Sequence, residues 1–151
     1  MLTNKFKINY SIGSVANGIK TDSFTFFLLF FYSNIIGLNP GLAGSAIFIA
    51  LCIDAVTDPL MGTISDRTST SLGRRHPYMM ISFIPMSLGY IFLFAPRQDW
   101  DMSQSDLFIW MTIFTVLTRI GMTLFDIPHR AFGGEVTKNY KERTILMSWR
   151  E

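Results

Sequence analysis

The chain has 151 residues, of which 49% are apolar and only 16% are charged. An ordinary soluble domain has about 25% charged residues, and the mean hydropathy here is +0.31, so the composition argues against a soluble enzyme and favours a membrane protein with several spans. The net charge of +2 is too small, and the basic residues are too scattered, to indicate nucleic-acid binding.

Four stretches are long and apolar enough to cross a bilayer, which takes roughly 20 residues of helix. They lie at about 10–36, 41–65, 78–95 and 107–128, separated by segments rich in glycine, proline and polar residues. A fifth helix is expected to begin at about 142–151, where the sequence ends. We therefore expect an all-α integral membrane bundle whose remaining helices belong to a missing part of the same chain.

The basic residues predict the orientation of these spans. The N-terminus and the second and fourth connections contain nine Lys or Arg residues, whereas the first and third connections contain one, Arg97. Because positive charges remain on the cytoplasmic side, we expect a multi-pass protein of the cell (inner) membrane with a cytoplasmic N-terminus.

Ionisable residues interrupt three of the four spans, namely Lys20 and Asp22, Asp54 and Asp58, and Arg119 and Asp126. Each costs about 2.5–3.5 kcal/mol at the centre of a bilayer, which indicates a function. Two cations and four carboxylates leave two negative charges over. The surplus predicts either a hard cation such as Na⁺ or protons held on the carboxyl groups.

The spacing of these charges adds detail. Asp54 and Asp58 are four residues apart and share one helix face, about 6 Å apart in rise, so they repel each other unless a cation or a proton lies between them. Arg119 and Asp126 also share a face. Ion pairs that only hold the helices together are the alternative, in particular for Lys20 and Arg119.

Small residues are expected where helices approach each other closely, and the candidates are Gly13, Gly18, Gly41, Gly44 and Ala50.

The connection between the second and third spans combines an acid, three arginines and glycines. Asp66 at a helix end can anchor an arginine, and an arginine fork can hold a neighbouring helix end. Such a clamp can be made in one state and broken in another, so we expect a cytoplasmic gate. Its residues are Gly62, Asp66, Arg67, Gly73, Arg74 and Arg75.

The order glycine, Asp-Arg, Gly-Arg-Arg resembles the signature loop of the major facilitator superfamily. Three further segments are similar to its glycoside–pentoside–hexuronide:cation symporters, typified by the melibiose permease: Asp54-Ala-Val-Thr-Asp58-Pro59-Leu-Met-Gly62, Asp126-Ile-Pro128, and the run from Gly133 to Thr144. The resemblance extends from about Tyr10 to the end. It implies the N-terminal part of a twelve-helix bundle, with helices 1–4 and the start of helix 5.

By this resemblance, the cation ligands would be Asp54, Asp58, Thr123 and Asp126. Substrate would contact Asp126 and Arg150, with Lys20, Asp22, Arg119 and Arg130 as further candidates. The sequence departs from the melibiose permease at four positions, one of which is Asn17, where the permease has a basic residue. Its sugar-binding aspartate aligns with Gly18, for which Asp22 is a proposed substitute, and its sugar-stacking tryptophan aligns with Arg130. Arg119 replaces a small residue, so its guanidinium could replace the cation's charge.

The leading hypothesis is secondary active symport of a sugar or glycoside, driven by Na⁺ or H⁺ through alternating access. It needs no covalent chemistry, hence no enzyme activity, no cofactor and no metal beyond a Na⁺ site; its partners are a small-molecule substrate and membrane lipid. The alternatives are a symporter of amphipathic anions, such as a lysolipid or a glucuronide, and a non-transporting membrane adaptor. An intramembrane aspartyl hydrolase is disfavoured because Asp54 and Asp58 lie on one helix.

Overall fold

The computed structural model describes Phe24 and residues 27–70 and 73–135, with side chains as far as Ala131. The described segments are helical and contain no strand. In chain order they are α2 (Leu28–Phe30), the π-helix η2 (Phe31–Ile36), α3 (Pro40–Arg67), α4 (His76–Ile81), α5 (Phe83–Leu93), the 3₁₀ turn η3 (Gln98–Trp100) and α6 (Gln104–Glu135).

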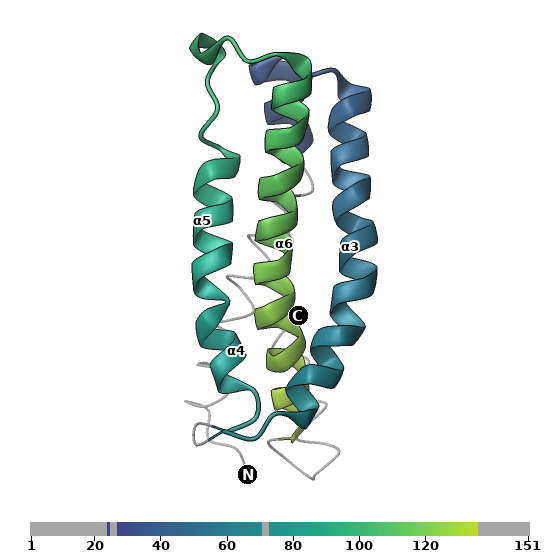
Figure 1. Ribbon diagram of the computed structural model, residues 1–151, viewed down its shortest axis with the longest axis vertical. Helices are drawn as coiled ribbons and strands as arrows, with labels where there is room; N and C mark the ends of the chain where they lie inside the picture. The colour runs from purple at the N-terminus through teal and green to yellow at the C-terminus, as the bar shows by residue number, and fades with distance from the viewer. Residues whose placement is uncertain (1–23, 25–26, 71–72, 136–151) are drawn as a thin grey trace.

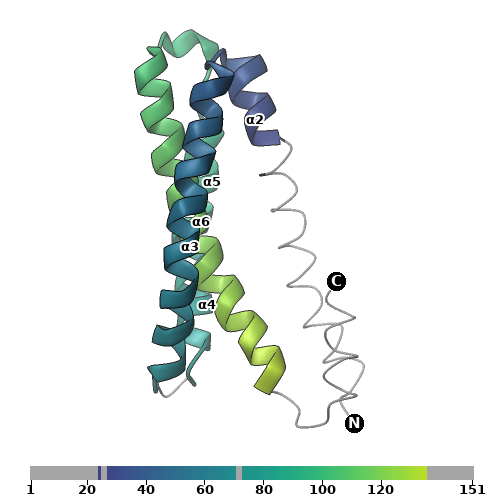
Figure 2. The ribbon, with the colours of Figure 1, turned by 90° about the vertical axis from the view of Figure 1, so that its right-hand side faces the viewer.

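The long helices lie side by side along the long axis of the bundle, with α6 between α5 and α3 (Figure 1). Each runs antiparallel to the one before it, and α4 continues the line of α5. One end carries the turn after η2 and the segment around η3, and the opposite end carries the connection from α3 to α4. The C-terminal part of α6 leans away from α3 and α5, while α2 lies beside the start of α3 (Figure 2).

The turn between η2 and α3 follows from local sequence. Gly37 closes η2 with a φ of +85°, a left-handed conformation that glycine adopts without steric cost. Asn39 then caps α3, its side chain accepting a hydrogen bond from the Gly41 amide at 2.8 Å, and Pro40 occupies the first helical position. Gln104 holds this turn against α6, donating to the Gly37 carbonyl and accepting from the Asn39 amide, each at 2.8 Å.

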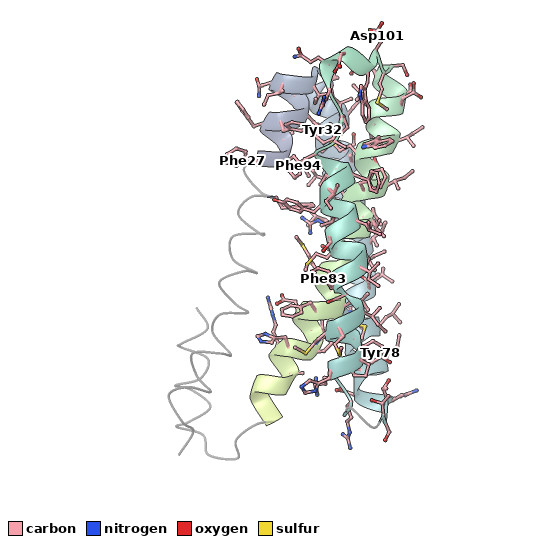
Figure 3. The ribbon with its side chains drawn as sticks, turned by 90° about the vertical axis from the view of Figure 1, so that its left-hand side faces the viewer. Phe27, Tyr32, Tyr78, Phe83, Phe94 and Asp101 are labelled. Carbon is pink, nitrogen blue, oxygen red and sulfur yellow. The ribbon has the colours of Figure 1, made fainter. Side chains whose placement is uncertain are left out.

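The main apolar core lies near that same end. Its largest fully buried members include Leu28, Tyr32, Leu93 and Met111, contributed by four different helical segments. The hydroxyl of Tyr32 donates to the Leu93 carbonyl at 2.7 Å, so it satisfies a carbonyl at the C-terminus of α5 that has no partner within its own helix. Tyr32 and Phe94 are near each other at this level of the bundle in Figure 3.

Two glycines let α5 and α6 approach each other closely. A Cβ atom at Gly89 would lie 2.9 Å from the Thr118 amide nitrogen, and one at Gly121 would lie 2.6 Å from the Met86 amide nitrogen. Among the small residues expected at helix contacts, Ala50 is buried, whereas Gly41 and Gly44 are exposed, and a Cβ atom at either would meet no other helix that the structure describes. Gly13 and Gly18 lie outside the described residues.

The predicted spans can be compared with these helices. The stretch 41–65 lies within α3 and the stretch 107–128 within α6, and both helices are long and apolar enough to cross a membrane. The stretch 78–95 is divided at Ser82 into α4 and α5, because Pro85 lacks an amide hydrogen and its ring crowds the preceding turn. Of the stretch 10–36, the structure describes Phe24 and residues 27–36. The predicted helix start at 142–151 lies outside the described residues.

Candidate functional site

A pair of polar contacts joins α3 to α6 near the middle of both helices. Arg119 Nη1 donates to Asp54 Oδ2, and Thr123 Oγ1 donates to Asp58 Oδ1 at 2.7 Å. Each helix contributes residues that are four positions apart, so both partners face each other in the same register. The two carboxylates therefore point to α6 and to different partners.

Arg119 also reaches the first helical stretch. Its guanidinium carbon lies 5.7 Å from the centre of the Phe24 ring, and Phe24 is buried, so a cation–π contact supports the ion pair. The side chains of Arg119 and Asp54 are 21% and 19% exposed. Arg119 Nε and Asp54 Oδ1 are both buried without a hydrogen-bond partner among the described residues, which leaves one carboxylate oxygen of Asp54 available.

Asp58 differs from Asp54 in its partner. Within the described part of the chain, its side chain is hydrogen-bonded to the Thr123 hydroxyl and forms no ion pair. Arg119 is the cationic partner of Asp54, so Asp58 is the carboxyl group of α3 that has no cationic partner at this level of the described structure. A hydroxyl group and carboxylate oxygens are ligands for a hard cation, which makes Asp58 and Thr123 the centre of a candidate cation site.

Asp126 lies further along α6 and is bound to its own helix. Arg130 Nη2 donates to Asp126 Oδ2 at 2.8 Å, an i, i+4 pair in which Arg130 is 53% exposed. Over the residues that the structure covers, Asp54, Asp58 and Asp126 do not form a group that could hold a metal ion. The four-residue ligand set thus stays a prediction, of which the structure brings Asp58 and Thr123 together.

The connection from α3 to α4 contains an ion pair between an acid and an arginine. Arg75 Nη2 donates to Asp66 Oδ1 at 2.9 Å, with the Arg75 side chain buried and that of Asp66 63% exposed. Thr68 and the Tyr78 hydroxyl share a hydrogen bond of 2.5 Å across the same connection. Of the three candidate arginines, the structure therefore pairs Arg75 with Asp66; Arg67 and Arg74 are exposed.

Three candidate substrate residues, Lys20, Asp22 and Arg150, lie outside the described residues. Sequence reasoning did not identify Phe24 as a neighbour of Arg119, since an apolar run gives no signal of which ring faces a charge. It also left the partner of Arg119 open.

Two helices of the described bundle are long and apolar enough to cross a membrane, and an ion pair joins them. The model of the family described as MFS/sugar transport protein matches residues 9–151. The chain belongs to this family, and its fold is the N-terminal part of a major-facilitator helical bundle.

Curated relatives agree. The chain is 34% identical over 149 residues to a protein of Escherichia coli named "Putative glycoside/cation symporter YagG", a match that covers 99% of this chain and 32% of the relative. It is 31% identical to the inner membrane symporter YicJ of the same organism, with the same coverage. It is 30% identical to the sodium-dependent lysophosphatidylcholine symporter 1-A of Danio rerio, with 99% and 27% coverage. The chain thus spans about a third of the length of the relatives it matches.

Proposed function

We propose that this chain is part of a cation-coupled symporter that moves a sugar or glycoside across the cell (inner) membrane by alternating access. The observation that carries the proposal is the arrangement of Asp54 and Asp58 opposite Arg119 and Thr123, inside two helices apolar enough to span a bilayer. Intramembrane carboxylates are costly and mark ion pathways. The family membership and the names of the two bacterial relatives support the proposal of a cation-coupled symporter.

In this proposal Asp58 and Thr123 bind the coupling ion, Na⁺ or H⁺, with the free oxygen of Asp54 and with Asp126 as further ligands. Arg119, Arg130 and Asp126 line the substrate path on α6, together with Lys20, Asp22 and Arg150. The protein acts by binding and conformational change and not as an enzyme. The N-terminus and the connection from α3 to α4 face the cytoplasm.

The contact between Asp66 and Arg75 would close the cytoplasmic side in one state. Arg75 is held in a buried position, whereas Asp66 is largely exposed and can leave it. This difference in exposure suits an ion pair that breaks when Asp66 moves with the end of α3.

The experiment uses the full-length protein in membrane vesicles, with inward Na⁺ and pH gradients imposed separately. The test substrates are radiolabelled methyl-β-glucoside, methyl-α-galactoside and methyl-β-xyloside. We expect at least one of them to accumulate above its external concentration under one gradient and only to equilibrate without it. Equilibration alone for all three under both gradients would contradict symport of glycosides.

A second candidate, a symporter of amphipathic anions such as a lysolipid or a glucuronide, is supported by a different observation. Phe27, Tyr90, Ile91 and Phe94 line a shallow apolar cavity of about 400 Å³, in which a hydrocarbon tail could lie, and Phe27 and Phe94 are at one level of the bundle in Figure 3. The Danio rerio relative is named for lysophosphatidylcholine. Competition decides between the two. Under the second candidate, labelled lysophosphatidylcholine or labelled methyl-β-glucuronide is taken up, and an excess of neutral glycosides does not inhibit that uptake.

A further inference from the structure

We propose that Arg119 is a tethered cation that competes with the coupling ion for Asp54 and thereby sets the affinity of the site for Na⁺. This inference rests on the proposed function, because it assigns a role within the same ion site. Its basis is that the Arg119 guanidinium already binds one oxygen of Asp54, in a place where a hard cation would need carboxylate oxygens as ligands.

The position of the guanidinium is well supported on both sides. Asp54 holds it from α3, and the buried ring of Phe24 lies 5.7 Å from its central carbon. An arginine remains charged at every physiological pH. The competitor is therefore permanently present, and its local concentration does not depend on the medium.

The charge balance leads to the same conclusion. Asp54 and Asp58 together would offer a cation two negative charges, but Arg119 neutralises the first and leaves one. A free ion that binds between the two carboxylates is either attracted by one negative charge in place of two, or it must displace the guanidinium from Asp54. Either route lowers the affinity of the site for Na⁺.

Displacement of the guanidinium would also connect binding of the coupling ion to binding of the substrate. A guanidinium released from Asp54 is free to donate hydrogen bonds to another acceptor, and an arginine fork suits carboxylates and phosphates in particular. Arg119 would then be a specificity-determining residue for the ion.

The test measures Na⁺ binding directly, by isothermal titration calorimetry of the purified full-length protein, with choline chloride keeping the ionic strength constant. We expect Arg119→Ala to lower the Na⁺ dissociation constant by about tenfold or more, a coupling of ordinary size. Arg119→Gln removes the charge but retains an amide donor for Asp54, so it serves as the variant least prone to misfolding. Arg119→Lys keeps a cation beside Asp54 and should bind Na⁺ like the wild type.

The matched control is Arg97→Ala, which removes the same charge from an exposed position outside the helices; we expect it to leave Na⁺ binding unchanged. If the wild type shows no measurable binding, its appearance in Arg119→Ala and Arg119→Gln supports the proposal. Unchanged or weaker binding in both variants, each eluting as a monodisperse protein, would overturn it, as would an equal shift in Arg97→Ala. Failure of glycoside uptake would instead contradict the proposed function, since calorimetry detects the ion without any transport.

Discussion

Arg119 of α6 donates a hydrogen bond to Asp54 of α3, although 65 residues separate them in the chain. The pair is about four-fifths buried on both sides. Removing one partner of a buried ion pair strongly destabilises the folded protein, because the other charge stays buried and uncompensated. One contact therefore serves both the packing of two helices and the charge balance of the candidate ion site.

The hydroxyl group of Thr123 should contribute to the binding of the coupling ion. Thr123→Val removes the donor to Asp58 while keeping the shape of the side chain, and we expect the cation concentration for half-maximal uptake to rise several-fold. Thr123→Ser should restore it. Thr112→Val is the control on the same helix, because the Thr112 hydroxyl donates to the Phe108 carbonyl of its own helix at 2.7 Å. Equal effects of the two valine variants would contradict the assignment.

The clamp at the end of α3 predicts a difference between neighbouring arginines. Arg75 is buried and paired with Asp66, whereas Arg74 is exposed. We expect Arg75→Ala to slow uptake several-fold more than Arg74→Ala, measured as initial rates in vesicles with matched amounts of protein. Similar rates for the two variants would mean that the loop only sets topology.

The close approach of α5 and α6 at Gly121 should be intolerant of a methyl group. A Cβ atom there would lie 2.6 Å from the Met86 amide nitrogen, and overpacking of this kind costs about 1–3 kcal/mol. We expect Gly121→Ala to lower the melting temperature in detergent. Gly44→Ala is the control, since a Cβ atom at Gly44 meets nothing within 4 Å in the described structure, and it should leave the melting temperature unchanged.

The Tyr32 hydroxyl should contribute measurably to stability. Tyr32→Phe leaves the buried Leu93 carbonyl without this donor, and an unsatisfied buried acceptor costs about 1–3 kcal/mol. Thermal unfolding in detergent measures the loss. Tyr90→Phe provides the comparison, because the Tyr90 hydroxyl has no hydrogen bond that the described structure records. An equal loss of stability in Tyr90→Phe would indicate that the hydrogen bond from Tyr32 to Leu93 does not stabilise the protein.

The sequence predicts the long helices well because a bilayer span requires a continuous apolar run, which is visible without any partner. It does not predict the division at Ser82, since the apolar run passes through Pro85 without interruption. The sequence likewise predicts that some glycines lie at helix contacts, but it does not predict which ones. Which glycine faces a backbone depends on the rotation of α5 against α6, and the structure selects Gly89 and Gly121 in preference to Gly41 and Gly44.

The same reason limits the prediction of the site. The spacing of Asp54 and Asp58 shows that they share a face of one helix, and that of Arg119 and Asp126 that they share a face of another. The spacing within helices does not fix the register between them. Only that register decides that Arg119 meets Asp54, that Thr123 meets Asp58 and that Asp126 turns to Arg130.

The central claim is that Asp58 couples the movement of a cation to uptake. The most direct measurement is accumulation of the best of the three glycosides by vesicles containing full-length Asp58→Asn, under the gradient that drives the wild type, with Asp99→Asn as the exposed control. We predict that Asp58→Asn loses accumulation but still exchanges labelled for unlabelled substrate, and that Asp99→Asn behaves like the wild type. Accumulation by Asp58→Asn at the wild-type level would contradict the account.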